Sequence, residues 1–130
     1  MGYRQEYQRS LSEPDAFWRE AAGAIDWTTE PTVVCDDTAA PLYRWFSDGV
    51  LNTCYNALDR HIAERGDQQP ALHYVSPVTD SARTLTYAEL LDEVSTFAGV
   101  LTDLGVQDGA RVVLSMPIVP EAVIALPARA

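Results

Sequence analysis

The chain has 130 residues, of which 47% are hydrophobic, and this composition suits a single globular domain with a buried core. A net charge of -10 argues against binding to nucleic acid or to anionic membranes, because both require a positive surface. All nine basic residues are Arg, so a Schiff-base lysine, a phosphate-loop lysine and an amine general base are excluded from this chain.

The N-terminal stretch is expected to form two short helices. Tyr3 and Tyr7 begin a helical spacing of apolar residues. Ser12 is a candidate N-cap for the second helix, with Pro14 in its first turn and an end near Ala24. The aromatic residues that follow exceed what so short a stretch can bury by itself. They therefore predict a helical and irregular wrap that packs on a larger body.

Residues 28–41 are rich in Thr, Asp, Pro and Ala, a composition that favours irregular, extended chain. A short strand at residues 32–35 is the most regular structure expected there. The sequence Ser-Asp-Gly at residues 47–49 then predicts a turn before the next helix.

A capped amphipathic helix is predicted for residues 52–66. Asn52 is a candidate N-cap, and Gly66 is expected to take the left-handed conformation that ends a helix. The apolar positions recur at the spacing that places side chains on one helical face: Cys54, Ala57, Leu58, His61 and Ile62. This pattern predicts a scaffold helix with no evident reactive group.

Residues 71–75 and 83–86 are predicted to be two strands of an antiparallel hairpin, joined by the loop 76–81. A long helix follows, because Thr86 and Glu89 match the Thr-x-x-Glu capping box. The apolar stripe of this helix consists of Leu90, Val94, Phe97, Leu101 and Leu104.

Residues 111–116 form an apolar run that suits a strand buried on both faces of a parallel sheet. Together with the preceding strand and helix, this run would begin an α/β layer. Pro120 would open a further helix, which Pro127 ends because it lacks an N–H and has a fixed φ. The expected fold class is therefore α/β, with a sheet that is incomplete at residue 130.

Four side chains of metal-ligating type are present, Cys35, Cys54, His61 and His73, but no two have the short spacing of zinc sites. Cys54 lies near a helix start, where the helix dipole could stabilise a thiolate. It also lies on the apolar stripe, where burial raises the pKa of a thiol, so a packing role is favoured. No catalytic, cofactor-binding or metal-binding residue is predicted in this chain.

Three other features have plain structural interpretations. The adjacent acid pairs at residues 36–37 and 92–93 do not face one another and are expected on the surface. The loop 76–81 carries hydroxyl groups but no Gly-rich run that could cradle a phosphate. The helix start at Pro120 follows a predicted strand, where α/β sheets bind anions, but Pro120 has no N–H and Glu121 repels an anion.

The sequence shows none of the common targeting signals, and a cytoplasmic location is therefore expected. The two cysteines are expected to be reduced, because no secretory pattern is present. The N-terminus lacks an apolar signal core and has Glu6 where a myristoylation signal needs Ser or Thr. The most apolar region, residues 112–126, is interrupted by Pro117, Pro120 and Glu121, so no membrane-spanning helix is expected.

A strong resemblance to the N-terminal region of short-chain acyl-CoA synthetases is carried by residues 45–61, which read Trp-Phe-Ser-Asp-Gly-Val-Leu-Asn-Thr-Cys-Tyr-Asn-Ala-Leu-Asp-Arg-His. The form of residues 53–61 resembles propionyl-CoA synthetase in particular. Further similar segments are Leu-Thr-Tyr-Ala-Glu-Leu at 85–90 and Met-Pro-Ile-Val-Pro-Glu-Ala at 116–122. Beyond Ala125 the family pattern is lost, which indicates a truncation or a shifted reading frame.

The resemblance implies the beginning of the N-terminal domain of an adenylate-forming enzyme. Residues 1–60 would be an acetyl-CoA-synthetase-type N-terminal region, residues 61–126 the truncated start of an AMP-binding domain, and residues 127–130 a divergent tail. Full-length members use ATP, Mg²⁺ and CoA to convert a carboxylic acid to an acyl-adenylate and then to an acyl-CoA. Their phosphate loop, adenine-binding and ribose-binding residues and C-terminal Lys do not occur in this chain.

Two functions follow from this resemblance. The first is the N-terminal piece of an ATP-dependent acyl-CoA ligase for propionate or acetate, inactive by itself. The second is a non-catalytic interaction module that docks on a full-length synthetase through exposed aromatic side chains and an open sheet edge. The choice between propionate and acetate stays open, because the acyl pocket of the family lies outside the matching segments.

Overall fold

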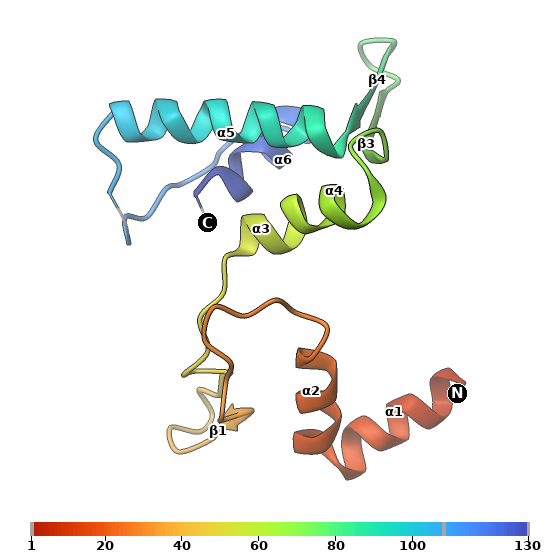
Figure 1. Ribbon diagram of the computed structural model, residues 1–130, viewed down its shortest axis with the longest axis vertical. Helices are drawn as coiled ribbons and strands as arrows, with labels where there is room; N and C mark the ends of the chain where they lie inside the picture. The colour runs from red at the N-terminus through yellow and green to blue at the C-terminus, as the bar shows by residue number, and fades with distance from the viewer. Residues whose placement is uncertain (1, 108, 130) are drawn as a thin grey trace. The chain divides into compact units, whose positions relative to one another are not determined.

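A computed structural model describes residues 2–107 and 109–129 of the chain. The chain divides into two compact units, Met1–Asn52 and Thr53–Ala130, and Figure 1 labels their helices and most of their strands. Length and composition predicted a single domain, whereas the chain forms two compact units.

The described part of the Met1–Asn52 unit contains two helices joined by a sharp corner, followed by short paired strands. The elements are α1 (Tyr3–Ser12), α2 (Pro14–Ala22), β1 (Cys35–Asp36) and β2 (Arg44–Trp45). β1 and β2 pair antiparallel, and an isolated bridge joins Thr29 to Val50. The strand expected at residues 32–35 is therefore displaced toward the C-terminus.

The corner between α1 and α2 departs from the predicted cap. Ser12 is the last residue of α1, and Glu13 occupies the N-cap position of α2 without a side-chain capping bond, so the Ser12 cap is wrong. Pro14 opens α2 as predicted, because its missing N–H costs nothing in the first turn. Arg9 of α1 forms an ion pair with Glu20 of α2.

The aromatic side chains of this unit pack against one another. The ring centroids of Trp18 and Trp45 lie 5.7 Å apart, and those of Trp27 and Phe46 also lie 5.7 Å apart. Trp18 and Trp45 stay 40% and 48% exposed, so mutual contact covers only part of their surface. The packing of this unit on a larger body stays a prediction.

The described part of the Thr53–Ala130 unit is built on one hairpin and a long helix. Its elements are α3 (Thr53–Ala57), α4 (Asp59–Arg65), β3 (Pro70–Ser76), β4 (Ser81–Thr86), α5 (Tyr87–Asp103), α6 (Pro120–Ala125) and the 3-10 turn η1 (Pro127–Arg129). The predicted antiparallel hairpin is confirmed, and so is the helix that opens at Pro120. The expected tail at 127–130 includes Ala130, which lies outside the described residues.

The capping box predicted at the start of α5 is confirmed. The Glu89 N–H donates to Thr86 Oγ1 at 3.2 Å, and the Thr86 N–H donates to the Glu89 carboxylate at 2.8 Å. The second bond holds the pKa of Glu89 below its ordinary value, because the backbone donor stabilises the charged form. An ion pair between Arg83 of β4 and Glu93 of α5 lies near the same end of the helix.

The hydrophobic core of this unit lies where α5 meets the hairpin, α4 and α6. It consists of Leu58, Leu85, Leu90, Val94 and Ile124. Val94 is only 2% exposed, whereas Leu104, at the far end of the predicted stripe, is 76% exposed. The apolar stripe of α5 is therefore buried along its first turns and open to solvent at its C-terminal end.

The single helix predicted for residues 52–66 is wrong, because it breaks at Leu58 into α3 and α4. Leu58 has φ and ψ of −125° and −67°, and its side chain is 4% exposed in the core. The hydrogen bond from the Leu58 N–H to the Cys54 C=O is kept at 2.8 Å. Gly66 has a positive φ of 88°, but its ψ of 161° lies outside the left-handed helical region.

The strand predicted for residues 111–116 is not formed in the described structure. Figure 1 shows uncoiled chain without a strand arrow between α5 and α6. β4 pairs with β3, and the described residues offer this run no strand partner. An apolar run becomes a strand only where a neighbouring backbone can pair with it, and the described residues place no such backbone beside this run.

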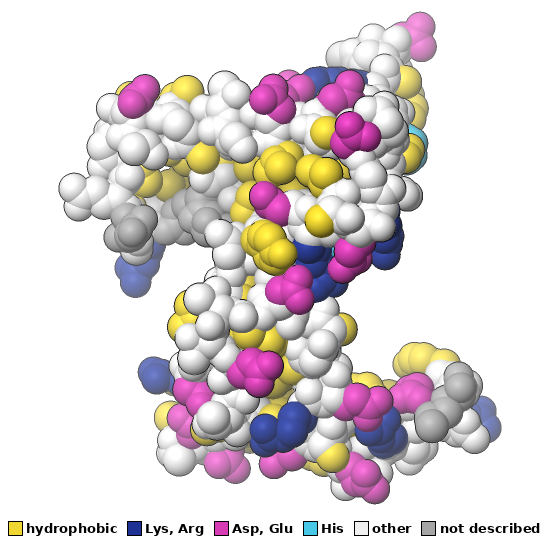
Figure 2. Space-filling view, viewed as in Figure 1, with side chains coloured by type: hydrophobic (Ala, Val, Ile, Leu, Met, Phe, Trp, Pro, Cys, Tyr) yellow, Lys and Arg dark blue, Asp and Glu magenta, His cyan; other side chains and the backbone are white. Residues whose placement is uncertain are grey.

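Figure 2 shows one face of the molecule coloured by side-chain type. Acidic side chains are scattered over this face, with arginines among them, and they do not gather in one patch. Among residues 2–107 and 109–129, none of the helices combines the length and the hydropathy that a membrane span requires.

Candidate functional site

The residues of metal-ligating and nucleophilic type lie in ordinary structural surroundings. Cys54 is half-buried against the core, and burial, followed by the charge of Asp59, raises the pKa of its thiol. This direction is opposite to the one that makes a cysteine reactive at neutral pH. Both Cys35 and Cys54 are free. Cys54 packs against the core, as its position on the apolar stripe predicted.

The two histidines also contact neighbouring elements of the fold. His73 Nδ1 lies 3.0 Å from Thr84 Oγ1 across the hairpin, and the His61 ring centroid lies 5.2 Å from that of Tyr87. No group of three His, Cys, Asp or Glu side chains in the described part of the chain could hold a metal ion.

The hydroxyl groups of the hairpin loop bond to one another. The Thr79 N–H donates to Ser76 Oγ at 3.3 Å, and the Thr79 and Ser81 hydroxyls lie 2.7 Å apart. At the start of α6, Pro120 is buried and no side chain caps the helix.

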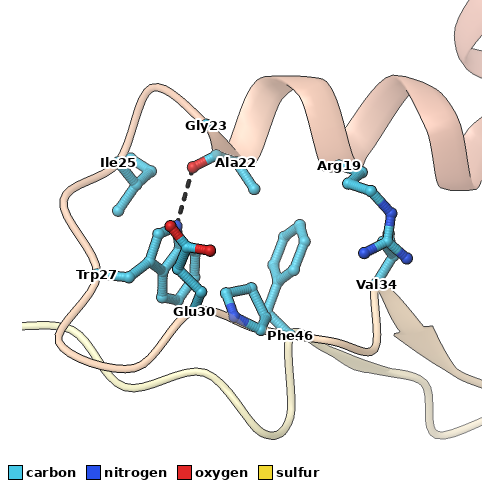
Figure 3. Close-up of a pocket in the computed structure, with 9 residues that line it drawn as sticks. Arg19, Ala22, Gly23, Ile25, Trp27, Glu30, Val34 and Phe46 are labelled. Carbon is cyan, nitrogen blue, oxygen red and sulfur yellow. Dashed lines mark hydrogen bonds between the residues drawn. The ribbon is translucent and has the colours of Figure 1, made fainter.

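The structure adds a cavity that the sequence did not reveal. It is a partly open cavity of about 260 Å³ in the Met1–Asn52 unit, between α2 and the two loops that follow it. Figure 3 shows its lining residues: Arg19, Ala22, Gly23, Ile25, Trp27, Glu30, Pro31, Val34 and Phe46. It is a candidate site in the described fold.

Trp27 fixes one wall of this cavity. Its indole Nε1–H donates to the Ala22 C=O at the end of α2, with a distance of 2.9 Å (Figure 3). A Cβ built on Gly49 would lie only 2.7 Å from Cζ3 of the indole ring, so residue 49 must be glycine for the ring to lie where it does. The wall therefore depends on close contact between the indole and the turn at residues 46–49.

Asp48 fixes the loop at residues 32–34, which forms another wall of the cavity. Its carboxylate accepts hydrogen bonds from the backbone N–H groups of Thr32 and Val33, at 2.9 and 3.2 Å, and from the Thr32 hydroxyl. These donors lower the pKa of Asp48 to about 2. The next residue, Val34, is 5% exposed and reaches the cavity, so the Asp48 bonds position one of its walls.

The cavity carries charge at two places. In Figure 3 Arg19 extends from α2 at one end, and Glu30 lies toward the other end near Trp27. Arg19 Nη2 donates to the Thr32 C=O at 3.3 Å. Both charged residues are exposed, and the other lining residues carry no ionisable side chain. This arrangement offers apolar contact area and lacks the nucleophile and base pair that covalent catalysis needs.

Sequence reasoning recognised the aromatic density of this unit but assigned it to packing on a larger body. The cavity depends on Trp27 reaching back to Ala22 and on the bonds between Asp48 and the loop at Thr32. Contacts between segments that are separated along the chain leave no periodic pattern in the sequence. The Asp-Gly pair at residues 48 and 49 was the available signal, and it predicted only a turn.

Comparison with protein-family models identifies the chain. The model described as "AMP-binding enzyme" matches residues 58–130, which is more than half of the sequence. The chain belongs to the AMP-binding enzyme family. A second model, "Acetyl-coenzyme A synthetase N-terminus", matches residues 3–57 of this family member. The short-chain acyl-CoA synthetase resemblance of the sequence is thereby confirmed.

Curated relatives of this AMP-binding enzyme chain agree with the family models. It is 44% identical over 122 residues to the acetyl-coenzyme A synthetase of Streptomyces avermitilis, a match covering 94% of this chain and 19% of the relative. It is 45% identical over 126 residues to the propionate–CoA ligase of Escherichia coli K12, covering 97% of this chain and 20% of the ligase. The chain thus spans about a fifth of the length of the relatives it matches.

A solved structure supports the fold of this AMP-binding enzyme chain. The acetoacetyl-CoA synthetase from Streptomyces lividans matches with a TM-score of 0.81 and 35% identity, over 98% of this chain and 20% of the synthetase. The expected fold class, an α/β N-terminal piece of such an enzyme, is therefore confirmed, although the strand at residues 111–116 is not formed in the described structure.

Proposed function

We propose that this chain is the N-terminal part of an ATP-dependent acid–CoA ligase that activates a short-chain carboxylate, propionate or acetate, as an acyl-adenylate. The observation that supports this function is the unbroken pair of matches, to an acetyl-CoA synthetase N-terminus at residues 3–57 and to an AMP-binding enzyme at residues 58–130. Relatives named for both acids are found at nearly equal identity, 44% and 45%. Both acids therefore belong to the proposal.

We infer further that residues 1–130 do not catalyse the reaction by themselves. Full-length ligases of this family use ATP, Mg²⁺ and CoA, and the residues of this chain do not fit these groups. The sequence has no Gly-rich phosphate loop and no Lys, and the cavity beside Trp27 carries one exposed Arg opposite an exposed Glu. We assign no step of the reaction to residues of this chain. The proposed division is 1–60 for the N-terminal region, 61–126 for the start of the AMP-binding domain and 127–130 for a divergent tail.

The test is ATP–pyrophosphate exchange with propionate and with acetate. The isolated chain is expected to show no exchange above the buffer blank, while intact E. coli propionate–CoA ligase serves as the positive control. Carboxylate-dependent exchange by the isolated chain would contradict the proposal, since the activity would then need no further residues.

A second candidate function is a non-catalytic module that docks on an intact synthetase. The exposed apolar side chains Leu104, Val113 and Ile118, which are 76%, 87% and 96% exposed, favour it. Co-purification with the intact E. coli ligase would support this function, and a monomer that ignores the ligase would count against it. A cytoplasmic location is proposed for either function, supported by the two free cysteines.

A further inference from the structure

The cavity beside Trp27 carries opposite charges at its two ends. Arg19 extends from α2 at one end, and Glu30 lies toward the other end beside the indole ring (Figure 3). Between them the lining is apolar, with Ile25 and Phe46 among its side chains. An apolar cavity with a few polar groups at fixed places is the usual form of a small-ligand site. The two charges therefore decide which ligand fits.

The Glu30 end of the cavity favours a positive charge. No hydrogen bond or ion pair joins the Glu30 carboxylate to another residue that the structure describes. The C-terminal end of α2, at Ala22 and Gly23, also lines the cavity, and a helix C-terminus carries partial negative charge. The ring centroids of Trp27 and Phe46 lie 5.7 Å apart, and aromatic faces attract ammonium groups. Three separate features thus favour an ammonium group at this end.

The Arg19 end of the cavity favours a carboxylate. Arg19 Nη2 donates to the Thr32 C=O at 3.3 Å, which holds the guanidinium against the loop at residues 32–34. A guanidinium has several further N–H donors, and a carboxylate accepts two of them in parallel. A ligand with only a positive charge would be repelled by Arg19, and a ligand with only a negative charge would be repelled by Glu30. A molecule that carries both charges, one at each end, satisfies both residues.

The volume of the cavity limits the size of this ligand. The cavity holds about 260 Å³, and a water molecule takes about 30 Å³ of liquid, so there is room for roughly eight or nine non-hydrogen atoms. A five-carbon ω-amino acid has a matching size, because it consists of five carbons, one nitrogen and two oxygens. Its charges lie at opposite ends of an apolar chain, whereas an α-amino acid carries both charges at one end.

We propose that this cavity binds a short ω-amino acid, with the ammonium group beside Glu30 and Trp27 and the carboxylate on Arg19. The inference does not depend on the proposed function, because all of the lining residues lie in the Met1–Asn52 unit and no step of the ligase reaction is involved. The ligand is neutral overall at neutral pH, so the net charge of -10 does not repel it.

The test measures binding to the 130-residue chain by isothermal titration calorimetry. The probe is 5-aminopentanoate, compared with pentylamine, which lacks the carboxylate, and with pentanoate, which lacks the ammonium group. A ligand of this size is expected to have a Kd on the order of millimolar. The probe is expected to bind about fivefold more tightly than either comparison ligand, because an exposed ion pair contributes up to about that factor. Equal binding of pentylamine or pentanoate, or no millimolar binding of the probe, would overturn the proposal.

The indole N–H signals of the three tryptophans locate the bound ligand. Trp27 lines the cavity, whereas Trp18 does not. In nitrogen–proton NMR spectra, Trp18→Phe and Trp45→Phe identify two of the signals, so the third belongs to Trp27. The Trp27 signal is expected to shift as 5-aminopentanoate is added, while the Trp18 signal stays in place. Binding that leaves the Trp27 signal in place would put the ligand elsewhere and overturn the proposal.

Two glutamates supply a matched pair of variants. Glu30→Gln removes the charge beside Trp27 and is expected to weaken binding of 5-aminopentanoate about fivefold. Glu13→Gln removes the same charge from an exposed position at the other end of α2, and it is expected to leave binding unchanged. Equal loss of binding in both variants would show an effect of net charge and would contradict the proposed site.

Arg19→Gln separates the contributions of the two ends. This variant is expected to bind 5-aminopentanoate and pentylamine equally well, because only the first ligand uses Arg19. Retained binding of pentylamine shows that the cavity persists without the bond to Thr32. A variant that still prefers 5-aminopentanoate would overturn the role of Arg19. The comparison of the three ligands on the unaltered chain decides the proposal if a variant does not fold.

Discussion

The carboxylate of Asp48 accepts hydrogen bonds from both the backbone N–H and the hydroxyl of Thr32, with the N–H donor 2.9 Å from Oδ2. The two residues belong to different loops, and hydrogen bonds to the Asp48 side chain join them without strand pairing. A single side chain thus fixes the position of the loop that carries Val34 into the cavity. Because the bonds need the charged carboxylate, this part of the fold depends on pH.

Acid is predicted to weaken the Met1–Asn52 unit through Asp48. Its pKa falls from an ordinary value of 3.8 to about 2 in the folded chain, so the stabilisation is fully present above pH 3.8 and is lost as the pH falls toward 2. Asp48→Ala is expected to lower the stability of this unit at neutral pH and to flatten its pH dependence in that window. Tryptophan fluorescence measures this unit alone, because Trp18, Trp27 and Trp45 all lie in it.

Asp37→Ala is the matched control for this prediction. Asp37 is exposed and lies in the same unit, and its removal is expected to leave the acid transition of the fluorescence unchanged. The same shift in both variants would show that net charge, and not the Asp48 bonds, sets the acid sensitivity.

Two glycine-to-alanine changes are predicted to have opposite signs. Gly49→Ala places a Cβ 2.7 Å from the Trp27 ring, so the ring must move and the Met1–Asn52 unit is expected to lose roughly 1–3 kcal/mol. Gly99→Ala lies within α5 with open space around its Cβ, and it is expected to gain about 0.5–1 kcal/mol. Urea unfolding followed by fluorescence and by far-UV circular dichroism measures the two changes, and equal signs would refute the contact between Gly49 and Trp27.

Alanine substitutions of two leucines near opposite ends of α5 test how far the core extends along this helix. Leu90 is 4% exposed and Leu104 is 76% exposed. Leu90→Ala is therefore expected to lower the free energy of unfolding by about 2–5 kcal/mol, and Leu104→Ala by less than about 0.5 kcal/mol. Circular dichroism in urea gives both values. A large loss at Leu104 would mean that the C-terminal end of α5 is covered in solution.

Removing the capping box of α5 is predicted to lower stability by less than removing a core side chain does. Thr86→Ala removes the acceptor for the Glu89 N–H and is expected to lower stability by about 1 kcal/mol. Thr102→Ala, at an exposed position near the other end of α5, is expected to be neutral or slightly stabilising because alanine is the better helix former. Chemical denaturation compares them, and no difference between the two variants would rule out the cap as a source of stability.

Elements with local signals were predictable from the sequence. The Thr86 and Glu89 capping box forms within one turn, and the hairpin needs only the neighbouring segment of chain as its partner. Both were therefore predicted correctly. The opening of α2 at Pro14 belongs to the same class, since the preference of proline for the first turn is a property of one residue.

Features decided by distant contacts were not predictable. The break at Leu58 places that side chain in the core beside Leu90, and no propensity of Leu predicts it. Residues 111–116 have the composition of a buried strand but find no partner among the described residues. The cavity beside Trp27 was missed because it is assembled by the Trp27–Ala22 and Asp48–Thr32 hydrogen bonds between separate segments.

The proposal that this chain serves as the N-terminal fifth of an acid–CoA ligase is tested most directly by replacement. The matching fifth of the E. coli propionate–CoA ligase is exchanged for residues 1–130 of this chain, and formation of propionyl-CoA from propionate, ATP and CoA is measured. The chimeric ligase is predicted to form propionyl-CoA, whereas the isolated 130-residue chain is predicted to be inactive in the same assay. A replaced enzyme that unfolds cooperatively, and is therefore folded, yet forms no acyl-CoA from propionate or acetate would contradict the proposal.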